Sequence, residues 1–156
     1  MIYNFYVDGS YRYPTGIGAW AWVYAKLVDR SFHYGTHRTG LAELARDRRG
    51  TEEIEIHAIL QALLVVPAFS EVNVYTDSEP ALRVLTDPDN NWSSTKRIRA
   101  LTMGPEAKLQ VILHKIPRRS DIFAEYADSL ASHRRRNEDL GPFWLYCARL
   151  GEKEVI

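Results

Sequence analysis

Four carboxylates stand where they could do chemistry instead of only facing solvent: Asp8, Glu55, Asp77 and Asp128. The first and third each end a short run of residues with strand preference, and the other two fall on the apolar or small-residue side of helical patterns. Burying an unpaired carboxylate costs free energy. These positions therefore point either to a local partner or to a function.

If the four acids meet in one pocket, their charges repel, and in the absence of cations the pKa of at least one rises. Carboxylate oxygens with no accompanying cysteine or histidine cluster suit a hard cation such as Mg²⁺ or Mn²⁺. Two such ions about 4 Å apart can activate a water and stabilise the leaving oxygen of a phosphodiester. No Ser-His-Asp or Cys-His arrangement stands out, and His57, on a different helical face from Glu55, is interpreted as structural.

Both aspartates that follow strands also have an ordinary structural interpretation. Asp8 precedes Gly9-Ser10, and Asp-Gly is common turn chemistry, so Asp8 is either a turn former or a functional group at the end of a strand. Asp77 could be the N-cap of the helix that opens with Ser78-Glu79-Pro80. For Asp77 the two roles are compatible, because the cap position is also the carboxyl end of a strand.

Strand preference and short connections predict an antiparallel meander of three strands, Ile2–Val7, Gly16–Leu27 and Ser31–Thr39. A polar loop, Tyr11–Thr15, and a turn at Asp29-Arg30 join them. The alternating aromatic row Trp20, Trp22 and Tyr24 could stack bases. The interpretation that we prefer is that it covers the core beneath a helix.

The remaining chain alternates helices with strands. After a loop at Gly40–Gly50, Thr51 is the expected N-cap of a helix that ends at Pro67, and Glu55 projects from its apolar face. Further elements are expected at 72–76 (strand), 78–84 and 95–103 (helices), 109–116 (strand), a helix capped by Ser120 or Asp121, and a helix near 143–150. On the helix that Ser120 or Asp121 caps, Asp128 lies among alanines.

This order predicts an α/β fold with a five-stranded mixed sheet in the order 3-2-1-4-5, in which strand 2 is antiparallel to the rest. Helical crossovers require the fourth and fifth strands to run parallel to a neighbour. Asp8 and Asp77 then lie at the carboxyl ends of adjacent parallel strands, where open α/β sheets place their sites.

Composition narrows the class of protein. The 156 residues, 46% hydrophobic and 26% charged, predict one domain, expected to be a monomer. Zero formal net charge means that nucleic-acid binding requires local patches. The single cysteine, Cys147, excludes an internal disulfide and a cysteine-rich zinc site. With no membrane-length apolar run and no signal-peptide pattern, we expect no membrane association and a reducing, cytoplasmic location.

Four segments in order resemble the signature segments of ribonuclease H, type 1: Val7-Asp8-Gly9-Ser10, Glu55-Ile56-His57-Ala58, Tyr75-Thr76-Asp77-Ser78 and Ala127-Asp128-Ser129-Leu130-Ala131. The element order is similar to that fold from residue 1 to about 135, with 136–156 as a C-terminal extension. The resemblance implies a ribonuclease H-like domain that hydrolyses the RNA strand of RNA/DNA hybrids and leaves 5′-phosphate ends.

The resemblance also implies two bound Mg²⁺ ions, with Mn²⁺ as an alternative. Asp8 bridges both ions, Glu55 and Asp77 hold the ion nearer the leaving group, and Asp128 holds the ion that activates water. Ser10 becomes a phosphate or sugar contact near the scissile bond.

The chain departs from the family pattern at the substrate contacts. Thr51 and Glu52 stand where asparagines usually contact the bases and the RNA 2′-hydroxyls that distinguish RNA from DNA. Arg118 and Arg119 occupy the region of the expected loop histidine, where they could bind phosphate, although arginine is a poor proton shuttle. The arginines of the 40–50 loop, Arg46, Arg48 and Arg49, could add a backbone contact. Alternative functions are a nuclease that acts on DNA and a non-catalytic nucleic-acid-binding module.

Overall fold

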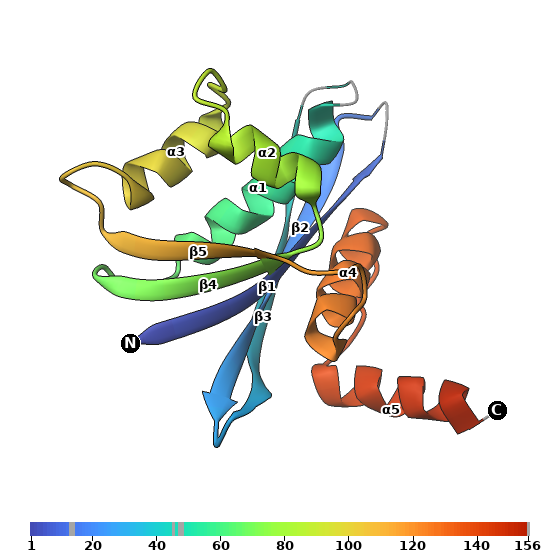
Figure 1. Ribbon diagram of the computed structural model, residues 1–156. Helices are drawn as coiled ribbons and strands as arrows, with labels where there is room; N and C mark the ends of the chain where they lie inside the picture. The colour runs from blue at the N-terminus through green and yellow to red at the C-terminus, as the bar shows by residue number, and fades with distance from the viewer. Residues whose placement is uncertain (13–14, 45, 47–48, 156) are drawn as a thin grey trace.

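The computed structural model (Figure 1) describes residues 1–12, 15–44, 46 and 49–155. The strands are β1 (Ile2–Arg12), β2 (Ile17–Val28), β3 (Ser31–Glu43), β4 (Ser70–Thr76) and β5 (Leu109–Lys115). The helices are α1 (Arg49–Leu63), α2 (Glu79–Thr86), α3 (Ser93–Thr102), α4 (Ile122–Arg135) and α5 (Phe143–Val155). The sheet order is β3-β2-β1-β4-β5, with β1, β4 and β5 parallel and β2 antiparallel to its neighbours. The predicted fold class is confirmed.

Helices cover both faces of this sheet (Figure 1). On one face, α1 packs on β1 and β2 and is flanked by α2 and α3. Trp20 and Trp22 lie in the core beneath α1, and Tyr24 packs against it. The predicted core role of the aromatic row is therefore confirmed. On the other face, α4 packs on β1, β2 and β3 over a second core that includes Tyr6 and Tyr126.

Strand β1 is longer than the sequence pattern predicts, and Asp8 is not at its end. The strand continues through Gly9 and Ser10 to Arg12, because its antiparallel pairing with β2 continues there, with Asp8 opposite Ala21. The turn interpretation of Asp8 is therefore wrong, and Tyr11, predicted to begin a loop, lies within the strand. Residues 13–14 of that predicted loop are outside the described part. The parallel pairing with β4 ends at Tyr6 opposite Tyr75. Asp8 thus lies just beyond the end of that pairing, beside the carboxyl end of β4.

Two other boundaries differ from the prediction. Strand β3 continues to Glu43 and α1 begins at Arg49, so the connection between them is shorter than the expected loop 40–50. Arg48 in this connection lies outside the described residues. Thr51 is inside the first turn of α1 and is not its N-cap, because the helix begins two residues earlier.

The caps of two later helices are clear. The N-cap of α2 is Ser78, whose Oγ accepts a hydrogen bond from the Ala81 N–H, so Asp77 is not the cap. The N-cap of α4 is Asp121, one of the two residues predicted, and its Oδ1 accepts from the N–H of Phe123 at 2.7 Å. With Ser78 capping α2, the carboxylate of Asp77 is left to face the sheet edge.

Helix α1 lies unusually close to β1 at Gly9. A β-carbon at Gly9 would lie 2.8 Å from Cγ2 of Ile54, closer than such atoms approach one another in proteins. The glycine therefore permits the close approach of the helix to the strand. Among the helices of the described chain, none has the length and apolar character needed to cross a membrane.

Candidate active site

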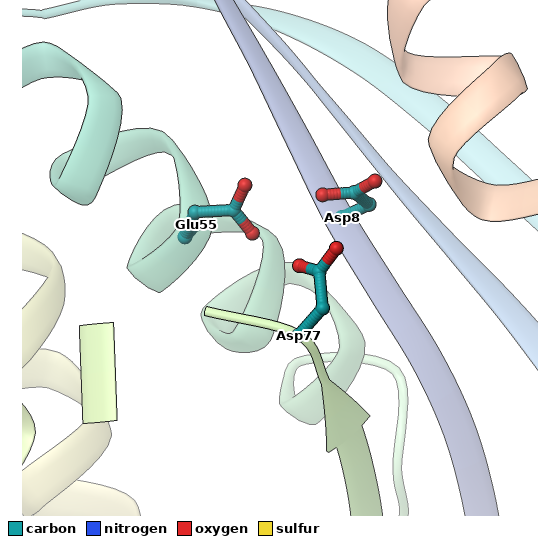
Figure 2. Close-up of side chains that lie close together, drawn as sticks. All are labelled: Asp8, Glu55 and Asp77. Carbon is teal, nitrogen blue, oxygen red and sulfur yellow. The ribbon is translucent and has the colours of Figure 1, made fainter. Parts of the chain in front are cut away.

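Three of the four predicted acids converge at one place. Asp8 comes from β1, Glu55 from α1 and Asp77 from the residue that follows β4, and each offers an oxygen within 4.8 Å of the others. Figure 2 shows the three carboxylates turned toward one another. The strand alternation, the helical periodicity and the parallel crossover together bring residues separated by up to 69 positions into one group, and we call the place where these three acids meet the acid crevice.

Burial and mutual repulsion dominate the electrostatics of this crevice. Glu55 is 9% exposed, and its burial, with the charge of Asp77 adding to it, raises its pKa to about 8 even though the hydrogen bond with Asp8 favours ionisation. Asp8 is 6% exposed, and its pKa is raised well above its usual range by burial and then by the charges of Glu55 and Asp77. Without a cation, the crevice therefore retains protons that isolated carboxyl groups would release.

One oxygen of the crevice has no partner. Oε2 of Glu55 is buried without a hydrogen bond, whereas Oδ1 of Asp8 accepts the Gly9 N–H at 2.8 Å. Within the described part of the chain, neither carboxylate forms an ion pair. A buried carboxylate oxygen without a partner is balanced either by a retained proton or by a cation. The all-oxygen donor set fits a hard divalent cation such as Mg²⁺ or Mn²⁺.

Asp77 is the least buried of the three acids. It is half-buried, and burial, followed by the charge of Asp128, raises its pKa, while Arg118 and Lys115 oppose that rise. Arg118, which follows β5, therefore lies close enough to act on the crevice electrostatically.

Asp128 lies beside the crevice but outside the group of three. Its Oδ2 accepts from both Nε and a terminal nitrogen of Arg119, each at 2.9 Å. The side chain of Asp128 is 14% exposed and that of Arg119 is 56% exposed. Since the neighbouring Ala127 and Ala131 are fully buried against the sheet, α4 brings Asp128 near enough to influence Asp8 and Asp77. The structure thus groups three of the four predicted acids, and the fourth lies beside them, close to Asp8 and paired with Arg119.

The predicted substrate contacts lie on three different parts of the chain and differ in their partners. Ser10 follows Asp8 on the same face of β1, and its Oγ accepts a hydrogen bond from Nε of Arg135 at 2.7 Å. Arg118 and Arg119 are exposed in the connection before α4, and Thr51 is exposed in the first turn of α1. The sequence analysis did not single out Arg135 individually. The available signal was its position seven residues after Asp128, which places both on one side of a helix.

Two histidines near the crevice have structural surroundings. His57 hydrogen-bonds Ser94 at 3.2 Å and Gln61 at 3.1 Å, which agrees with its structural interpretation. His114 hydrogen-bonds Asn73 at 2.9 Å and stacks on Tyr75. Both ring positions are fixed by neighbours away from the carboxylates.

The fold and the crevice define a class: a five-stranded 3-2-1-4-5 sheet that carries buried acids at the carboxyl end of its central parallel strands. The comparison with family models agrees with this class. The model described as RNase H matches residues 2–139, and the chain belongs to the RNase H family. Among curated proteins, no sequence matches the chain.

Proposed function

We propose that the protein is a metal-dependent endoribonuclease that hydrolyses the RNA strand of RNA/DNA hybrids and leaves 5′-phosphate ends. The observation that carries this proposal is the acid crevice, with its unpartnered Glu55 Oε2, in a chain of the RNase H family. A non-catalytic module has no need for clustered acids beside a phosphate backbone, because they repel it.

In this proposal Asp8, Glu55, Asp77 and Asp128 hold two divalent cations, Mg²⁺ or Mn²⁺. The bound ions would supply water activation on one side of the scissile phosphate and charge stabilisation of the leaving oxygen on the other. Glu55 and Asp8 contribute by losing the proton that burial retains in the metal-free crevice. Asp128 would contribute once a bound cation replaces Arg119 as the partner of its carboxylate.

Ser10, Thr51, Arg118 and Arg119 are the proposed substrate contacts. The exchange at Asp128 releases the planar guanidinium of Arg119, which matches phosphate oxygens with two parallel N–H donors. Arg118 lies close enough to Asp77 to lower its pKa, so it is placed to meet a phosphate held at the crevice. Ser10 and Thr51 are suited to single hydrogen bonds with the backbone or a 2′-hydroxyl.

The experiment is a cleavage assay on RNA/DNA, RNA/RNA and DNA/DNA duplexes of one sequence, with either strand end-labelled, in Mg²⁺ or Mn²⁺. We expect cleavage of the RNA strand in the hybrid and its loss in Asp77→Asn. Exposed Glu71, near the start of β4 and at the opposite end of that strand from Asp77, provides the control Glu71→Gln. Hybrid cleavage that survives in Asp77→Asn contradicts the metal assignment.

A second candidate is a nuclease of the same fold that acts on DNA. Glu52 favours it, because a carboxylate in the first turn of α1 is unsuited to donate to a 2′-hydroxyl and repels a phosphate. The same three duplexes decide between the candidates: metal-dependent cleavage of the DNA duplex at a rate comparable to the hybrid supports the second.

A further inference from the structure

The four basic residues His133–Arg136 at the end of α4 have different partners and point in different directions. Arg136 pairs with Glu138 at 3.3 Å, and His133 binds the carbonyl of Ser129 at 2.8 Å. Exposed Arg134 lines a cavity that also contains His37 of β3. Only Arg135 is directed toward the strand that carries Asp8, where its Nε donates to Ser10 Oγ.

Two independent periodicities place the Ser10–Arg135 pair on the same side of the molecule as the acids. Ser10 follows Asp8 by two residues on one face of β1, which is about 7 Å along the strand. Arg135 follows Asp128 by seven residues on one side of α4, which is about 10 Å along the helix. Phosphates of one strand succeed each other about every 3.4 Å along a duplex axis, so the pair lies within a few phosphates of the crevice.

The pair retains hydrogen-bonding capacity for an anion. A guanidinium has five N–H donors, and Ser10 takes one of those of Arg135. Within the described residues, the others have no protein acceptor. Ser10 acts as the acceptor in this bond, so its own O–H is available to donate. Arg135 is half-buried whereas Arg134 and Arg136 are exposed, so its guanidinium is held in place before any ligand arrives.

We propose that Arg135 and Ser10 together form a binding site for a backbone phosphate of the nucleic-acid substrate, a few nucleotides from the scissile bond. Alternation along β1 puts exposed Arg12 on the same face, which adds positive charge at the far side of Ser10. The proposal rests on the proposed function, and it assigns to α4 a second role beyond presenting Asp128.

The test compares Arg135→Gln with the matched control Arg134→Gln in the full chain. Binding of fluorescent RNA/DNA and DNA/DNA duplexes is measured by anisotropy in EDTA, which prevents metal-dependent cleavage, over a series of NaCl concentrations. We expect Arg135→Gln to weaken binding about tenfold and to make the slope of log K against log[salt] less negative by about 1. Arg134→Gln should leave both quantities unchanged.

Two further variants separate charge from structure. Arg135→Lys keeps the charge and should retain the wild-type salt slope. If Arg135→Gln does not fold, Arg135→Met, which keeps the apolar stem, takes its place. In Mg²⁺ the charge-removing variant should raise KM and leave kcat unchanged, because the phosphate contact is made equally in the ground and transition states.

The outcomes distinguish this proposal from the proposed function. A chain that binds duplex but does not cleave it overturns the nuclease assignment, and the salt slopes still decide the role of Arg135. If cleavage occurs and the two glutamine variants share the wild-type slope, the phosphate site is overturned. A lower melting temperature in Arg135→Gln with an unchanged slope also overturns it, because Arg135 then only joins α4 to β1.

Discussion

Two polar clusters follow one another along β1 and β4, one before and one after the aromatic pair Tyr6 and Tyr75, and they have opposite properties. In the first, Nδ2 of Asn73 donates to Oδ1 of Asn4 at 3.1 Å, and the His114 ring bonds Oδ1 of Asn73 at 2.9 Å. In the second, Asp8, Glu55 and Asp77 present acceptors to one another. The first cluster contains its own donors, whereas the second must keep a proton or take up a cation to balance its charges.

A stacked aromatic layer separates the clusters. Tyr6 stacks on Tyr75 with ring centroids 4.8 Å apart, and Tyr75 stacks on His114 at 4.7 Å. This layer connects β1, β4 and β5 between the two clusters. The comparison teaches that burial of polar groups alone does not mark a site: the acids differ from the asparagines because several like charges are buried together without complementary partners.

The largest expected effect comes from removing a charge from the acid crevice. Glu55→Gln should lower the cleavage rate at least about 100-fold, because even residues that only support metal ligands cost up to that much when changed. The same variant should melt at a higher temperature than the wild type in EDTA at pH 8, since it no longer buries a carboxylate. The cleavage rate and the melting temperature are measured on one preparation of Glu55→Gln. If both fall, the carboxylate of Glu55 stabilises the metal-free fold, which contradicts the comparison.

The self-satisfied cluster should respond in the opposite way. Asn73→Ala leaves Asn4, which is 5% exposed, without its hydrogen-bond donor. We expect a loss of about 1–3 kcal/mol in the free energy of unfolding, measured by urea denaturation, with the cleavage rate per folded molecule within about threefold of wild type. A large loss of cleavage rate in fully folded Asn73→Ala would mean that the asparagine cluster also contributes to catalysis, which contradicts the comparison.

The stability of the metal-free protein should depend on pH through Glu55. Its pKa is about 8 in the folded chain against an ordinary value of 4.5, so the folded state keeps a proton that the unfolded state releases. Stability therefore falls as pH rises from about 4.5 to 8. Mg²⁺ at 100 times its Kd should add about 2.7 kcal/mol to the free energy of unfolding. At one fixed Mg²⁺ concentration, the gain in melting temperature should be greater at pH 8 than at pH 5. Calorimetric scans at both pH values test this, with Glu55→Gln as the variant in which the difference shrinks.

The smallest stability effect is expected at Arg119. Its pair with Asp128 is more than half exposed on the arginine side, and such pairs contribute at most about 1 kcal/mol. Arg119→Ala should thus barely change the melting temperature but should lower the Mg²⁺ concentration needed for half-maximal activity, because Asp128 no longer has a competing cation. An unchanged Mg²⁺ requirement would mean that Arg119 does not compete for Asp128.

The strand order and three positions of the crevice could be predicted because they depend on periodicity. Alternation placed Asp8 on one face of β1, helical spacing placed Glu55 inward, and the crossover rule placed Asp77 beside Asp8. Strand ends were harder to predict. The pairing of β1 with β2 extends past Gly9, a long-range contact that outweighs the local turn preference of Asp-Gly.

Side-chain partners outside the periodic elements could not be predicted either. The ion pair of Asp128 depends on the path of the connection before α4, in which Arg119 adopts a positive φ of 54°. The sequence offers Asp77 as the cap of α2, but aspartate and serine both cap helices well. Only the structure shows that Ser78 takes that role.

The contact between Gly9 and Ile54 has a consequence for the acids on either side of it. Gly9 follows Asp8 and Ile54 precedes Glu55, so the separation of two negative groups is set by an uncharged contact in which neither takes part. A single added methyl group at Gly9 would push the helix off the strand and move Asp8 and Glu55 apart. The spacing of the acids, and with it the affinity of the proposed metal site, can therefore be tuned by bulk alone, with every carboxylate left in place.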